Sequence, residues 1–419
     1  MFELGMRYQL VGVQAPFGFA QGDFVNVDPI TYLPLVVDPR TYDNQNSSWA
    51  VVDPTVVNVT SITVALPQAL KTKSAKVFQG VRLYVDPLPL ILATTPEAMQ
   101  GYIDQILVAV DDLTSTGMKV VIDFHIQPSP SSVPGWGISE FIDGPSGPKF
   151  TALKAAGVVM ATALLPYGNN VAFELFNVPP DPSLFVSPVN PWPQQIQSYW
   201  AAVRVAAPTL SLIISGAGGT IASLVNTISP VNFDVNTAYA AHAYIPPVFS
   251  MQGVVGSDYY YIHDLPFPPS LVTDSIFIEI AKMVAASVNS VDTLTADQRA
   301  VVVAFLKGEI TNYFAIPEDA NWINMQLSRL TAWALARGVP ANMIFVSEYG
   351  CPGNMISGDY VITGTDIQSR TNYVKAFLAV ANSLGISTSL NVLSDINGGY
   401  AITDSRQTFL PEILWALHS

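Results

Sequence analysis

Short apolar runs recur along the chain and alternate with longer stretches that place apolar residues at helical spacing. Val171–Phe176 is almost wholly apolar, and Pro179 and Pro180, which cannot donate to a sheet, follow soon after it. Read in this way, the sequence predicts eight strands: Arg7–Gln14, Gly80–Val85, Lys119–His125, Val171–Asn177, Ser211–Ser215, Asn236–Tyr244, Met343–Tyr349 and Thr388–Leu393.

Helical patterns separate these strands. Tyr102–Thr114 has apolar residues at helical spacing, with Gly117 just beyond as a stop signal, and Thr151–Leu165 and Tyr199–Ala207 precede the next two strands. Buried strands separated by helices imply a parallel sheet, and eight such units close into an α/β barrel, the (β/α)₈ TIM barrel. A doubly wound open sheet is the alternative. The glycine-rich segment Ser215–Thr220 lacks a GxGxxG pattern and is expected to form a tight βα loop.

Two connections are too long to be simple loops. Residues 15–60 are rich in Pro, Asn and Asp, and residues 253–340 contain further helical patterns at Ser275–Val288, Ala296–Leu306 and Trp322–Arg337. Neither contains an internal repeat or a low-complexity linker. We therefore predict that residues 1–419 form one barrel domain with long loop insertions.

Composition narrows the range of partners. Half of the residues are hydrophobic, 12% are charged, and the net charge is −14 with 18 Lys and Arg residues in no cluster. Nucleic acid and anionic membranes are therefore poor partners. The sequence contains no uninterrupted run of 18 apolar residues, so a membrane span is not expected. Cys351 is the only cysteine, so an intrachain disulfide is excluded. The first residues lack a classical signal peptide, but the sparse charge favours an extracellular or surface-assembled protein.

Polar residues stand at the carboxyl ends of the predicted strands, where such barrels place their sites. Any one of them could be a satisfied polar residue at the barrel rim, but their repetition on five strands predicts a functional site. A metal site from the two histidines and the glutamate lacks HxH or HExxH spacing, so neither a metal nor a cofactor is expected. The predicted site residues are Arg82, His125, Asn177, His242, Tyr244 and Glu348.

These segments resemble glycoside hydrolase family 5 over nearly the whole chain. VAFELFNVPP is similar to the family's FELFNEP, GVRLYV to the strand of its conserved Arg, KVVIDFH to the strand of its His, HAY to its His-x-Tyr, and FVSEYG to its nucleophile strand. The resemblance implies that Glu348 holds the nucleophile position. It also implies that Arg82, His125, Asn177, His242 and Tyr244 take substrate-binding places.

The chain departs from the family pattern at three positions. Val178 stands where the resemblance places the general acid/base Glu, and Met251 replaces a His found in some members. Aligning Gly398 and Gly399 puts Ser394 at the place of the Trp under the reacting sugar, and no Trp occurs between Trp333 and Trp415. A retaining glycosidase needs two carboxyl groups, and valine has no proton to give.

Three hypotheses follow. The first is a degenerate, cellulase-like barrel without normal glycosidase activity, which binds a β-glycan or another carbohydrate, or takes part in self-assembly or a larger protein assembly. The second is an active or weakly active retaining β-glycan hydrolase with a relocated acid, for which Asp181, Asp258 and Asp264 are loop candidates, whereas Glu174 is expected inside the barrel. The third is a different enzyme on the same barrel.

Overall fold

The computed structural model describes residues 80–115, 117–126, 136–179, 190–254, 257–271, 273–357, 360–362, 364–390, 400 and 410–418, with the backbone of five short strands between residues 2 and 49. Contacts divide the chain into two compact units. The first comprises residues 1–242, 329–347 and 385–389, and the second comprises 243–328, 348–384 and 390–419. The prediction of a single domain stays a prediction.

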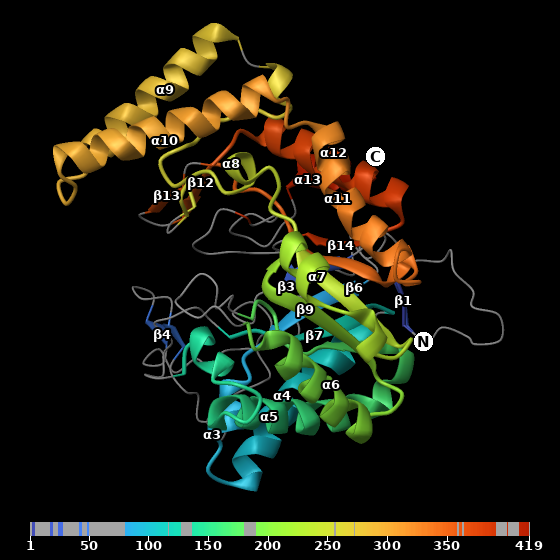
Figure 1. Ribbon diagram of the computed structural model, residues 1–419. Helices are drawn as coiled ribbons and strands as arrows, with labels where there is room; N and C mark the ends of the chain where they lie inside the picture. The colour runs from blue at the N-terminus through green and yellow to red at the C-terminus, as the bar shows by residue number, and fades with distance from the viewer. Residues whose placement is uncertain are drawn as a thin grey trace. The chain divides into compact units, whose positions relative to one another are not determined.

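Eight strands form a closed barrel in the order β10-β11-β14-β3-β6-β7-β8-β9, which confirms the predicted (β/α)₈ fold (Figure 1). The registers of β3 with β6, β6 with β7, β7 with β8, β8 with β9 and β9 with β10 are all parallel. The barrel strands are β3 (Phe24–Val27), β6 (Gly80–Val85), β7 (Lys119–Phe124), β8 (Val171–Glu174), β9 (Ser211–Thr220), β10 (Thr237–His242), β11 (Ile344–Tyr349) and β14 (Ser387–Leu390).

Strands and helices alternate around this barrel, and the helices cover strands that are buried on both faces. All six residues of β6 are buried, and β8 is buried throughout. The helices that follow the barrel strands are α3 (Leu88–Leu92) and α4 (Pro96–Ser115), α5 (Pro148–Leu164), α6 (Trp192–Ala206), α7 (Ile221–Thr227), α8 (Pro247–Ser250), α9 (Asp274–Asn289), α10 (Ala296–Ala315) and α11 (Ala320–Leu335), α12 (Ile367–Leu384) and α13 (Pro411–His418).

The first predicted strand was wrong. Residues 7–14 lie outside the described residues, and the barrel position beside β6 is taken by β3, within the segment expected to form loops. Several short apolar pieces precede residue 80, and periodicity cannot say which of them pairs with β6. The other short strands pair outside the barrel: β1 (Phe2–Leu4) with β2 (Phe17–Phe19), β4 (Tyr42–Asp43) with β5 (Ser48–Trp49), and β12 (Met355–Ser357) with β13 (Tyr360–Ile362).

The expected loop at Ser215–Thr220 is a second correction. Strand β9 continues to Thr220, and α7 begins at Ile221 without a loop between them. The glycines permit this continuation because Gly218 and Gly219 have φ values of +75° and +63°, which other residues rarely adopt. Thr220 then caps α7 by accepting a hydrogen bond from the Ser223 amide.

Helix α5 packs against α4 and α6 on the outside of the first unit, where Figure 1 shows α5 and α6 near β7 and β9. Residues Pro148–Asn170 are long and apolar enough to cross a membrane by length and composition. Seven residues of α5, including Phe150 and Leu164, are buried inside the protein. Packing against its neighbours is thus one reason for the apolar composition of this helix.

In the second unit, α9 and α10 fall within the predicted insertion and pack side by side (Figure 1). Thr273 caps α9, while Thr295 and Gln298 form a reciprocal capping box at the start of α10. The predicted helices at Ser275–Val288 and Ala296–Leu306 are therefore present, and α10 runs on to Ala315.

Candidate functional site

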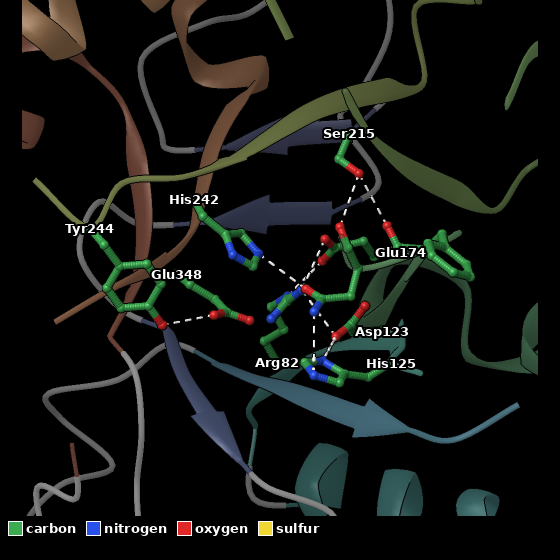
Figure 2. A network of polar contacts seen from close by, with 10 residues as sticks. Arg82, Asp123, His125, Glu174, Ser215, His242, Tyr244 and Glu348 are labelled. Atoms are coloured by element: carbon green, nitrogen blue, oxygen red, sulfur yellow. Dashed lines mark hydrogen bonds and ion pairs between the residues drawn. The ribbon is translucent and has the colours of Figure 1, made fainter. Parts of the chain in front are cut away.

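Arg82 occupies the centre of a buried polar cluster in the first unit (Figure 2). It is the only charged residue of β6, and its side chain is fully buried. Its guanidinium donates from Nε to Glu174 Oε2 at 2.6 Å and from Nη2 to Glu174 Oε1 at 3.0 Å. Nη2 also lies 3.0 Å from Asp123 Oδ2. Two buried carboxylates thus face one buried guanidinium. Removing one partner of such a buried ion pair destabilises the fold, because the remaining charge is left without its counter-ion.

Strand register brings the two carboxylates together. Asp123 of β7 is paired with Glu174 of β8, and both side chains are fully buried. Asp123 Oδ2 also accepts from Nδ1 of His125 at 2.9 Å. Its other oxygen, Oδ1, is buried and has no hydrogen-bond partner within the described part of the chain.

Asn177 connects the cluster to two histidines. Its Oδ1 accepts from Arg82 Nη2 at 2.7 Å and lies 3.1 Å from His242 Nε2, while its Nδ2 lies 3.3 Å from His125 Nε2. An amide NH₂ can only donate, so these contacts assign the acceptor role to His125 Nε2 and the proton to His125 Nδ1. By the same logic His242 Nε2 donates to Asn177.

The backbone of Asn177 is fixed as well. Its amide donates to the Phe124 carbonyl at 2.9 Å, and its carbonyl accepts from Ser215 Oγ at 3.1 Å. Ser215 Oγ makes a second contact with the Phe176 carbonyl, also at 3.1 Å. The polar end of β8 is therefore held from both neighbouring strands.

Val178 is the next residue, and its side chain lies close to Gly219. A Cβ added to Gly219 would lie 3.1 Å from Cγ2 of Val178, so the half-buried valine approaches the glycine backbone closely. The amide of Gly218 donates to the carbonyl of Pro179, which holds the two segments together. This close approach explains why residue 219 is a glycine and why the side chain at 178 is small.

Tyr244 and Glu348 form a pair in the second unit. The Tyr244 hydroxyl donates to Glu348 Oε2 at 2.8 Å, a contact drawn in Figure 2. The Glu348 carbonyl accepts from the Ala243 amide at 2.8 Å, and Glu348 is 6% exposed. The Tyr244 ring also packs edge-on against Tyr400 at 5.6 Å. Glu348 is thus held by both its backbone and its carboxylate.

The structure brings four of the predicted residues, Arg82, His125, Asn177 and His242, into one hydrogen-bonded cluster. It pairs two others, Tyr244 and Glu348. Ser394 lies outside the described residues. Among the residues that are described, no three His, Cys, Asp or Glu side chains are arranged to hold a metal ion.

Sequence reasoning missed two members of the cluster, and it did not consider Asp86 beside it. Asp123 stands two residues before His125 in a strand otherwise apolar after its first residue, which is a signal that could have identified it. Glu174 was expected inside the barrel, and it is, but its ion pair with Arg82 was not foreseen. Asp86 follows directly after β6, at the same strand end as Tyr84.

Comparison with known proteins places this geometry in a family. The family model of cellulase (glycosyl hydrolase family 5) matches residues 59–394. Among solved structures, an endoglucanase is 15% identical with a TM-score of 0.60, over 94% of this chain and 96% of its own. Subunit Z of the clostridial cellulose synthase from Clostridioides difficile is 16% identical with a TM-score of 0.59, over 95% of this chain and 100% of its own.

A family 5 xyloglucanase from Paenibacillus pabuli is also 16% identical with a TM-score of 0.59, over 95% of this chain and 98% of its own. At such identities the solved structures show the shared fold alone. No curated protein sequence matches the chain. The family match covers most of the residues and agrees with the closed barrel, so the chain belongs to glycosyl hydrolase family 5.

Proposed function

We propose that the chain is a degenerate member of family 5 that binds a β-glycan without hydrolysing unactivated β-glucans. The observation that carries this proposal is Val178. It follows the hydrogen-bonded Asn177 where the resemblance puts the general acid/base, and it packs against Gly219 in apolar contact. The position has no carboxyl group.

The chemical cost follows from the reaction. Retaining hydrolysis needs two carboxyl groups about 5 Å apart, one to attack and one to protonate the leaving oxygen. A positioned acid/base contributes about 10²–10⁴-fold in rate. Neither carboxylate of the cluster is a good replacement, because Glu174 contacts Arg82 through both oxygens and Asp123 contacts both Arg82 and His125. Of the loop candidates, Asp264 is bonded to His263 and Asn354, and Asp258 is exposed.

Carbohydrate remains the ligand class that the polar residues support. His125 and His242 are half-buried polar residues at strand ends, and Asn177 holds both in place. The solved relatives include an endo-beta-1,4-glucanase in complex with substrate and a xyloglucanase with ligand. A role in self-assembly or in a larger protein assembly, outside the cell or at its surface, is compatible with such binding.

A second function has one observation in its favour. Glu348 keeps a hydrogen bond from Tyr244 at 2.8 Å, which would position a nucleophile. In this alternative the chain is a weakly active retaining β-glycan hydrolase of the endo-β-glucanase type. Glu348 attacks substrates whose leaving group needs little protonation.

One set of assays separates the two functions. Wild type, Glu348→Gln and Val178→Glu are compared on polymeric β-glucan and on an aryl β-glycoside with and without azide, while calorimetry measures cello-oligosaccharide binding. We expect wild type to bind oligosaccharide and leave the polymer intact, and Val178→Glu to recover part of the aryl-glycoside activity. Brisk polymer hydrolysis by wild type that Glu348→Gln abolishes would overturn the proposal in favour of the second function.

A further inference from the structure

Asp86 lies at the edge of the polar cluster in the first unit. It follows Val85, whose carbonyl accepts a hydrogen bond from the His125 amide at 2.9 Å, so the ends of β6 and β7 hold Asp86 and His125 side by side. In the preceding strand, Arg82 and Tyr84 are two residues apart and lie on the same face, toward the cluster. The Tyr84 ring stacks on His125, with the ring centroids 4.1 Å apart. Asp86 is the residue directly after this strand, and it interacts electrostatically with His125.

The contacts of Asp86 use only part of its carboxyl group. Oδ1 accepts the Leu88 amide at 2.9 Å at the start of α3, and the backbone carbonyl accepts from the hydroxyl of Tyr102 on α4 at 2.9 Å. No hydrogen bond from the described residues reaches the second carboxylate oxygen. The side chain is half-buried and, among the residues that the structure describes, has no ion-pair partner of the kind that holds Glu174.

Burial raises the pKa of the Asp86 carboxyl to about 6, although the Leu88 amide and the nearby His125 both lower it. The titratable groups that face it are His125 from β7 and Tyr102 from α4, and the pKa of Tyr102 is itself raised well above its usual value by burial and by Asp86. The Asp86 carboxyl therefore changes charge around pH 6, where an ordinary aspartate stays ionised.

We propose that Asp86 is a hydroxyl-binding residue of the carbohydrate site, and that its ionisation controls the affinity of that site for a β-linked oligosaccharide. This inference rests on the proposed carbohydrate-binding function. An ionised carboxylate accepts charge-assisted hydrogen bonds from sugar hydroxyls, and it does so better than the protonated acid. Because the ligand favours the ionised form, affinity rises as the pH passes the point at which Asp86 loses its proton.

Calorimetric titration with cellotetraose between pH 5 and pH 8 tests this inference on the full chain. If binding needs the ionised carboxylate, the wild-type affinity rises about tenfold from pH 5 to pH 7, because the ionised fraction goes from roughly a tenth to roughly nine-tenths. Asp86→Asn can still accept the Leu88 amide, and its affinity should stay flat near the low-pH value of the wild type. Asp143→Asn is the matched control, since Asp143 also accepts helix-start amides, those of Lys149 and Phe150, and it should keep the tenfold rise.

The possible results separate the two proposals. Binding that does not change with pH, or a pH rise that survives in Asp86→Asn, overturns the role of Asp86 and leaves the proposed function standing. Absence of binding at every pH in wild type and Asp143→Asn contradicts the proposed function and this inference together. A thermal melt of each variant at pH 7 confirms that lost binding is not lost folding.

Discussion

The end of β8 holds two very different environments within a few residues. Glu174 and Asn177 belong to a cluster in which nearly every polar atom is used, with Arg82 bonded to both of them. Val178, one residue further on, is half-buried, and its side chain lies close to Gly219. One environment is kept in place by buried charge, and the other is a close approach between an apolar side chain and a glycine.

The difference between these two environments explains how a chain that has lost a catalytic carboxylate, as we propose for this one, can still keep a buried cluster such as that of Arg82. A buried ion pair is costly to break, because the remaining charge stays in a low-dielectric interior. The Arg82 cluster therefore has a structural reason to persist without catalysis, and its presence says little about activity. A carboxylate after Asn177 has no such reason, since no neighbouring charge depends on it, and a valine there satisfies the local packing.

The largest expected effect comes from removing the centre of the cluster. Arg82→Leu leaves Asp123 and Glu174 buried without their cation, so the free energy of unfolding should fall by about 3–5 kcal/mol. Urea denaturation at pH 7 measures it. The control is Lys149→Leu, which removes the exposed pair with Glu140 and should cost no more than about 1 kcal/mol. Equal losses in the two variants would mean that the cluster does not stabilise the fold.

Asp86 offers a carboxyl at the same rim without a cation. A pKa raised from 3.8 to about 6 means that its contribution to stability is full below pH 4 and is lost as the pH rises through 6. Asp86→Asn removes this loss, so its stability relative to wild type should increase between pH 4 and pH 7, by up to about 3 kcal/mol at 1.36 kcal/mol per unit. Thermal or urea unfolding across this range measures the difference. A difference that is constant with pH would show that Asp86 titrates as an ordinary aspartate.

Much of the barrel and of the polar cluster could be predicted from sequence, because the same strand patterns predict the fold and the polar residues near the strand ends. Gly80–Val85 was predicted to the residue, since its residues are apolar except for Arg82 and a buried parallel strand needs no alternation. The same rule placed Arg82, His125, Asn177 and His242 together, because parallel strands end at one rim.

What sequence could not supply was pairing between strands. Arg82 reaches Glu174 because β6, β7 and β8 align in a particular register, in which Asp123 is opposite Glu174, and no local pattern encodes that register. The extension of β9 through Gly218 and Gly219 was missed for a related reason. Glycines usually mark a turn, and only the approach of Val178 explains why Gly219 is needed within a strand.

A smaller effect tests the apolar contact itself. Gly219→Ala places a Cβ at φ +63°, 3.1 Å from Val178 Cγ2, and should cost about 1–2 kcal/mol from the backbone conformation plus a part from the contact. Adding Val178→Ala relieves the close contact but not the strain of the backbone conformation at residue 219. The double variant should therefore lose less free energy of unfolding than the two single variants together. Strict additivity in urea unfolding would contradict the close approach of the two residues.

The smallest expected change in stability comes from restoring a carboxylate after Asn177. In Val178→Glu the half-buried position lets the longer side chain reach water, so the loss should stay near 1 kcal/mol, within the range of ordinary substitutions. The matched variant is Glu174→Val, which makes the opposite exchange four residues earlier and leaves Arg82 with one carboxylate instead of two. We expect it to be destabilised by several times as much, because the fully buried Arg82 guanidinium loses the carboxylate oxygens that accept from its Nε and Nη2. If Val178→Glu unfolded as readily as Glu174→Val, position 178 would itself be under structural constraint, and its valine could no longer be read as the loss of a group that only catalysis requires.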